Sequence, residues 1–188
     1  MRMKIILLFV FLVSSFLVQA QSVRPKTPYW DLVAEIERAG LVPYQRYDWS
    51  ERSLQKLLRD VPIISKLVSE IGRKKIVYKM GGENAGYNGF TTVLKNGDIH
   101  LQVYYAKHLK IIDVALTLGH ELVHAYHIDS GLFDTWKSLV RNNKKEYAEC
   151  TSEIGAYAWS GIYASNQSTR DWVNKQMKDA QECVKKIK

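Results

Sequence analysis

Two histidines four residues apart, with a glutamate beside the first, are the residues of this chain best suited to chemistry: His120, Glu121 and His124. On an α-helix, residues at positions i and i+4 lie one above the other, so both imidazoles can reach one metal ion. Glu121 is rotated by about 100° from His120, where its carboxylate can meet a water molecule instead of the ion. The spacing therefore predicts a metal centre, with one Zn²⁺ per chain as the expected ion and Glu121 as a general base.

A catalytic zinc ion needs a third protein ligand and an open position for water. His127 is nearest in sequence, but on one continuous helix its backbone lies about 10 Å from that of His120, too far along the axis. A helix expected over residues 145–164 offers three acidic residues on one face: Glu146, Glu149 and Glu153. Glu153 is favoured because the small residues after it allow close packing, and Glu149 is a candidate hydrogen-bond partner for a ligand histidine. Glu146 and Glu149 stay open as alternative ligands.

Two segments of the chain, Gly119–Tyr126 (GHELVHAY) and Cys150–Ala156 (CTSEIGA), resemble the metal-binding motifs of gluzincin zinc metallopeptidases. The chain is similar in particular to the mitochondrial peptidase family that processes an ATP synthase subunit, and also to bacterial effector metallopeptidases. The resemblance covers residues 118–158. It implies a zincin-like fold and a zinc peptidase whose metal ligands are His120, His124 and Glu153, with Glu121 as the general base.

Neighbouring residues have expected roles in the same reaction. Tyr157 lies one helical turn after Glu153 and is the candidate hydrogen-bond donor to the oxyanion. The strand expected over Ile99–Tyr104, just before the metal helix, would offer an edge to an extended peptide or protein substrate. Two alternatives stay open. One is a hydrolase of another amide, such as a cell-wall peptide, and the other is a catalytically inactive zinc- or peptide-binding module on the same scaffold.

The hydrophobic pattern predicts an α+β fold, mostly helical, with a small antiparallel sheet before the metal-binding helix. Helices are expected from Pro28 towards Gly40, from Ser50 or Ser53 to Val61, and over 63–71, 111–128, 145–164 and 168–187. Short strands are expected over 75–78, 90–94 and 99–104, with Asn96-Gly97 as a hairpin turn. The helix over 111–128 is apolar on nearly every side, which is typical of a buried helix.

Residues 1–20 have the layout of a secretory signal peptide, with basic residues, an apolar run and the small-residue pattern Val18-Gln19-Ala20. We therefore expect residues 21–188 to form a single secreted or periplasmic domain without stable membrane insertion. In such a location a disulfide can persist. Cys150 and Cys183 lie at similar distances from the turn expected at 166–167, so they would face each other across a helical hairpin, and we predict that they are bonded.

The composition of the 188 residues, with 46% apolar and 24% charged side chains, is that of a folded globular protein. Lys and Arg number 27 against 19 Asp and Glu, which gives a net charge of +8. The basic residues are spread along the chain without interleaved aromatic residues, so nucleic-acid binding is not expected. Two cysteines are too few for a disulfide-dense scaffold or a four-thiolate zinc site.

Overall fold

The computed structural model describes residues 25–48, 50–83, 88–104, 106–132 and 144–187. The predicted signal peptide, residues 1–20, lies outside them. The elements in chain order are α2 (Pro28–Arg38), α3 (Glu51–Asp60), α4 (Pro62–Ser69), β1 (Ile76–Met80), β2 (Gly89–Val93), β3 (Ile99–Val103), the short 3-10 helix η1 (Ala106–His108), α5 (Ile111–Asp129), α7 (Lys144–Ile162) and α8 (Gln167–Ile187). The described chain is thus mostly helical with one small sheet, which confirms the α+β class.

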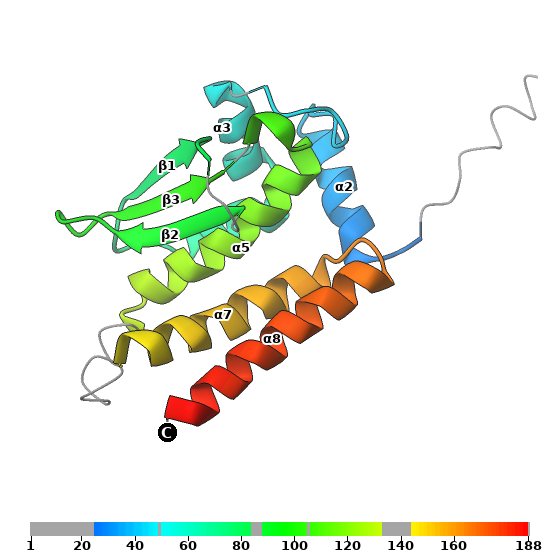
Figure 1. Ribbon diagram of the computed structural model, residues 1–188. Coiled ribbons are helices and arrows are strands. Elements are labelled where there is room, and N and C mark those ends of the chain that lie inside the picture. Colours follow the sequence, from blue (N-terminus) through cyan, green and yellow to red (C-terminus); the bar gives the residue numbers. More distant parts are fainter. Residues whose placement is uncertain (1–24, 49, 84–87, 105, 133–143, 188) are drawn as a thin grey trace, which may run out of the picture.

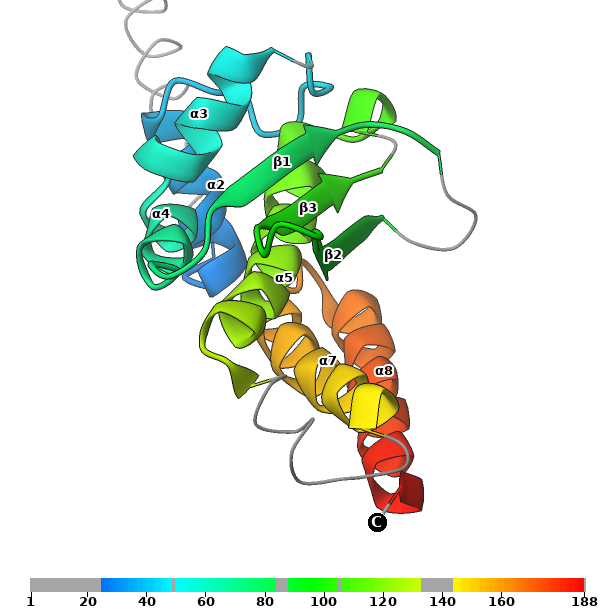
Figure 2. The same cartoon turned by 90° about the vertical axis from the view of Figure 1, so that its left-hand side faces the viewer.

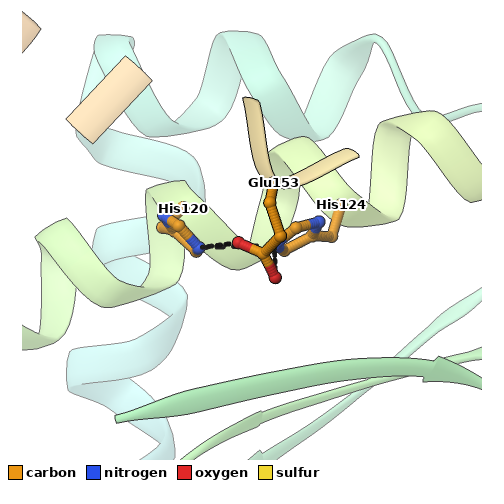
Figure 3. A group of neighbouring side chains, drawn as sticks. All are labelled: His120, His124 and Glu153. Carbon is orange, nitrogen blue, oxygen red and sulfur yellow. Dashed lines mark hydrogen bonds and ion pairs between the residues drawn. The ribbon is translucent and has the colours of Figure 1, made fainter. Parts of the chain in front are cut away.

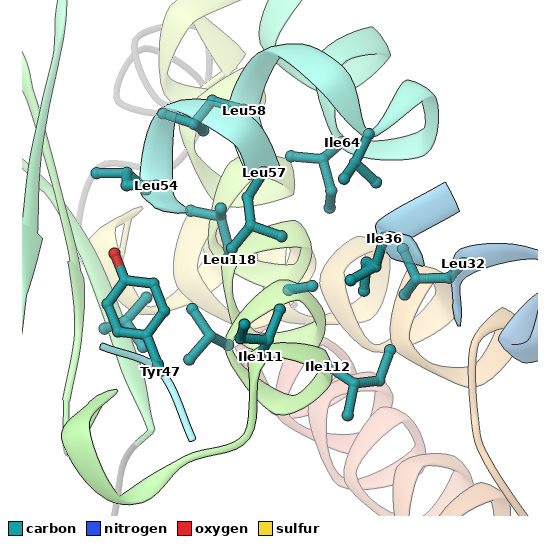
Figure 4. Close-up of a cluster of buried hydrophobic side chains, with 14 of the residues drawn as sticks. Leu32, Ile36, Tyr47, Leu54, Leu57, Leu58, Ile64, Ile111, Ile112 and Leu118 are labelled. Carbon is teal, nitrogen blue, oxygen red and sulfur yellow. The ribbon is translucent and has the colours of Figure 1, made fainter. Parts of the chain in front are cut away.

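Two of the three N-terminal helices, α3 and α4, begin where a side chain accepts a hydrogen bond from a backbone N–H of the first turn. Ser50 accepts a hydrogen bond from the Ser53 backbone N–H at 3.1 Å and starts α3. Pro62 starts α4, and Glu35 of α2 accepts a hydrogen bond from the Ile63 N–H at 2.8 Å. These helices bury their apolar faces against the first half of α5 (Figure 4). The resulting core holds the N-terminal part of the metal helix in place.

The sheet is mixed, so the expectation of an antiparallel sheet is wrong for one of its pairings. β2 and β3 form the predicted antiparallel hairpin, in which Gly97 has a φ of 88°. β1 pairs with β3 in parallel, and the strand order is β1-β3-β2. The next strand in sequence after β1 is β2, which lies at the opposite edge of the sheet, and β3 lies between β1 and β2 (Figure 2).

This topology also corrects the expected substrate edge. β3 is the central strand of the three described strands, so Ile99–Tyr104 does not provide an edge. β2 is an edge strand, and it packs against α5. The sequence shows the alternation of each strand but not the order of strands, because the order depends on pairing between distant segments. The edge beside the metal helix is therefore the one formed by β2.

Helix α5 lies between the sheet and α7, and α8 packs on α7 (Figure 1). Buried residues on more than one side of α5 contact these layers, as its continuous apolarity predicts. Its C-terminal end is tied to the connection between α4 and β1 by Asp129, which is 3% exposed. The Asp129 carboxylate accepts backbone hydrogen bonds from Gly72 at 3.1 Å and Arg73 at 3.0 Å. The N-terminal half of α5 is thus held by the core with the N-terminal helices, and its C-terminal end by the connection that leads into β1.

Helices α7 and α8 form an antiparallel hairpin closed by a disulfide between Cys150 and Cys183, which confirms the predicted pairing. Their Cα atoms are 6.1 Å apart, within the usual range for a disulfide. Asn166 caps α8 by accepting a hydrogen bond from the Thr169 N–H at 2.8 Å. None of the helices in the described part of the chain is both long and apolar enough to cross a membrane.

Candidate metal centre

The predicted ligand set comes together in the structure. His120 and His124 project from α5, and Glu153 reaches them from α7 (Figure 3). Their ligand atoms all lie within 4.8 Å of one another. The Nε2 atoms of His120 and His124 are 3.3 Å apart. Glu153 Oε2 lies 3.7 Å from His120 Nε2, and Glu153 Oε1 lies 3.5 Å from His124 Nε2. The three side chains point to one place, which is the arrangement a shared ion requires.

The Glu153 carboxylate provides a test of whether a cation fits. Its Oε2 atom is buried and has no hydrogen-bond donor among the described residues, although the side chain as a whole is partly exposed. A buried carboxylate oxygen without a donor is costly and uncommon in folded proteins. A metal ion bound between this oxygen and the two imidazoles would satisfy it. The donor set therefore fits a metal ion.

The charges in the site are consistent with an ionised Glu153. Burial alone would raise the pKa of this carboxyl, but the nearby imidazoles of His120 and His124 outweigh burial and lower the pKa to about 2. For His124, burial opposes the charged form, whereas Glu153 favours it and raises the pKa in the metal-free chain. A bound cation would take the place of the protons that balance this carboxylate.

Two serines of α7 form hydrogen bonds with the Nδ1 atoms of the two candidate ligand histidines, a role that the sequence did not predict. Ser160 Oγ lies 3.0 Å from His120 Nδ1 and donates its own proton to the Ala156 carbonyl at 3.0 Å. Ser160 must therefore accept from His120 Nδ1–H, which leaves a lone pair on His120 Nε2 for a metal. Ser152 Oγ lies 2.7 Å from His124 Nδ1.

The alternative ligands do not belong to the group. His127, Glu146 and Glu149 are outside it, and the two glutamates are exposed. The Nδ1 atoms of His120 and His124 are hydrogen-bonded to Ser160 and Ser152. The expectation that Glu149 is the hydrogen-bond partner of a ligand histidine is therefore replaced by these two serines.

Glu121 lies beside this group and contacts strand β2, and the sequence did not predict this contact. The Glu121 side chain is 5% exposed, and Thr91 Oγ1 donates a hydrogen bond to its Oε2 at 2.7 Å. Gly89, on the same face of β2, gives the carboxylate room, because a β-carbon there would lie 2.6 Å from Glu121 Cγ and 2.8 Å from Cδ. Burial raises the pKa of Glu121, although His124, Thr91 and His120 oppose the shift.

Tyr157 lies beside His120, with the two ring centroids 5.0 Å apart. Burial, together with the charges of Glu153 and Glu121, raises the pKa of Tyr157 to about 12. Its hydroxyl is therefore protonated at neutral pH and able to donate a hydrogen bond. Tyr157 is thus a neighbour of the group that could hold a metal ion.

Two glycines allow α5 and α7 to approach closely enough to share a site. A β-carbon at Gly119 would collide with the Trp159 ring, lying 2.6 Å from Cζ3 and closer to two other ring atoms. A β-carbon at Gly155 would lie 2.7 Å from His127 Cε1. One glycine on each helix thus accepts an aromatic ring of the other helix, and this packing sets how far Glu153 stands from the two ligand histidines.

Comparison of the chain with protein-family models, with curated proteins and with solved structures finds no match to any of them.

Proposed function

We propose that this protein is an exported zinc-dependent metallopeptidase with a zincin-like fold. The observation that carries the proposal is the convergence of His120, His124 and Glu153 with a separately held carboxylate, Glu121, next to them. Two imidazoles, one carboxylate and room for water are the donor set of catalytic zinc sites. When bound in such a site, Zn²⁺ supplies Lewis acidity and makes a water molecule easier to deprotonate.

Glu121 is the proposed general base. It accepts a proton from the attacking water and then delivers this proton to the leaving amine. Its burial suits the task, because a carboxylate pKa raised towards neutrality makes the group a stronger base that can also return the proton. Thr91 fixes the direction of the carboxylate through Oε2. The protonated hydroxyl of Tyr157, whose ring lies next to that of His120, is the proposed donor to the oxyanion.

A peptide or protein is the proposed substrate. β2 is an edge strand, and its face towards α5 carries Gly89 and Thr91, the two residues that contact Glu121. An extended peptide paired with this edge would bring its backbone past the general base. A disulfide in the helical hairpin is compatible with the proposed secreted or periplasmic location. Nucleic acid is not a proposed partner.

The inactive zinc- or peptide-binding module is the competing reading, and the surroundings of Glu121 count against it. A purely structural metal site is closed by four protein ligands and has no use for an additional buried carboxylate beside the ion. Burying this carboxylate, with Thr91 as its side-chain donor, costs folding free energy. A catalytic role for Glu121 would explain why the protein bears this cost.

The test is the variant Glu121→Gln, with Glu146→Gln as the matched control. Glu146 is an exposed acid of α7 outside the metal group, so its variant should behave as wild type. We expect Glu121→Gln to keep its zinc, measured by elemental analysis, and to lose hydrolysis of a peptide mixture followed by mass spectrometry. Undiminished hydrolysis by Glu121→Gln would exclude the mechanism. A zinc-loaded wild type that cleaves nothing would favour the inactive module.

A further inference from the structure

Helix α5 carries a third histidine, His127, to which the proposed reaction assigns no role. It is half-buried and lies outside the ligand group. Its ring nonetheless faces the site, with Nδ1 2.9 Å from Ser152 Oγ. The same oxygen is 2.7 Å from Nδ1 of the ligand His124. Ser152, which is 1% exposed, therefore stands between two imidazoles.

The His127 ring occupies a space that α7 leaves open for it. A β-carbon at Gly155 would lie 2.7 Å from Cε1 and 3.2 Å from Nε2 of His127. Any other residue at position 155 would push the ring out from between the helices. The ring is thus held in place by packing on one side and by Ser152 on the other.

The hydrogen-bond directions follow from the ligand role of His124. Because its Nε2 faces the ligand group, its Nδ1 carries the proton and donates to Ser152. Ser152 then has one proton to donate. In the parallel case of Ser160 this proton goes to the Ala156 carbonyl, whereas for Ser152 the acceptor that the structure shows is His127 Nδ1. Burial favours the neutral form of His127, which can accept it.

We propose that His127 is a positioning residue of the metal centre. Acting through Ser152, it fixes the tautomer and the ring orientation of His124, so that Nε2 is directed at the ion. A hydroxyl that donates is polarised and becomes a better acceptor, so the His127 bond also strengthens the bond from His124 to Ser152. The inference rests on the proposed metal site at His120, His124 and Glu153.

The experiment measures Zn²⁺ affinity, by competition with a chromophoric chelator at fixed pH, and so needs no substrate. Loss of an outer partner of a metal-ligating histidine weakens metal binding by about 10–100-fold. We expect a loss in that range for Ser152→Ala and for His127→Leu. His127→Asn, which can place an amide oxygen near the position of Nδ1, should bind zinc nearly as wild type. His108→Leu, at an exposed histidine, is the matched control and should bind as wild type.

The double variant His127→Leu/Ser152→Ala distinguishes the route of the effect. If His127 acts through Ser152, the double variant should bind zinc no more weakly than Ser152→Ala alone. Should His127→Leu not fold, His127→Phe, which keeps a ring between the helices but offers no acceptor to Ser152, should weaken binding in the same way. Wild-type zinc affinity in His127→Leu, or fully additive losses in the double variant, would overturn the inference. A wild type that binds no zinc would overturn the metal centre, and the inference with it.

Discussion

Gly89, which lies against the proposed general base Glu121, offers a sharp test by substitution. In Gly89→Ala the new β-carbon would lie 2.6 Å from Glu121 Cγ and 2.8 Å from Cδ. Favourable contacts between carbon atoms are about 3.5–4.0 Å long, so the carboxylate must move by roughly 1 Å. The strand cannot give way easily, because β2 is paired with β3 along its length. The side chain of Glu121 is therefore the part that shifts.

A displacement of about 1 Å at a reacting group can lower the rate by about 10²-fold, which corresponds to about 2.7 kcal/mol in the activation free energy. We expect Gly89→Ala to lose about this factor in kcat. Its zinc content should stay at the wild-type level, because neither ligand histidine nor Glu153 is among the atoms that the β-carbon approaches most closely.

The assay is the initial rate of peptide release from a fixed peptide mixture, together with elemental analysis of zinc. Gly72→Ala is the matched control, because a β-carbon there would meet nothing within 4 Å, and it should retain wild-type activity. A Gly89→Ala enzyme with wild-type kcat would refute the placement of Glu121 against β2. Loss of zinc in this variant would show that the strand supports the metal ligands rather than the base.

Two further predictions concern α7 and α8. Tyr157→Phe should keep its zinc and lower kcat by about 10²–10³-fold, the usual cost of removing one oxyanion donor; peptide-release rates check this, and wild-type kcat would remove Tyr157 from the mechanism. The variant Cys150→Ser/Cys183→Ser should lose about 4 kcal/mol of unfolding free energy, since the disulfide joins residues separated by 33 positions. Urea unfolding monitored by circular dichroism measures this loss, and an unchanged midpoint would mean that the hairpin is held by packing alone.

The features that the sequence predicted correctly are those with a local signal. The spacing of His120 and His124 on an apolar helix located two members of the group that could hold a metal ion, and the small residues that follow Glu153 singled it out as the third. Counting from a shared turn paired Cys150 with Cys183. In each of these cases the geometry of one helix, or of one helical hairpin, was sufficient.

The features that escaped prediction depend on contacts between distant segments. Thr91 can donate to Glu121, and Gly89 can leave space for it, only because β2 packs against α5. The order of strands in a sheet cannot be read from any one segment of the sequence. Ser152 and Ser160 support the ligand histidines from the next helix, and an isolated serine in a helical pattern does not reveal its partner. A search for small polar residues one helical turn or less from the predicted Glu ligand would have found Ser152 but not Ser160.

The most direct test of the central claim is the zinc content of the purified wild-type protein, compared with that of Glu153→Ala and of the control Glu146→Ala. We expect one zinc per chain in the wild type and in Glu146→Ala, and a loss of zinc in Glu153→Ala, because Glu153 is the proposed third ligand. Undiminished zinc in Glu153→Ala would assign the third ligand elsewhere. Absence of zinc from the wild type, even after reconstitution, would contradict the metal centre itself.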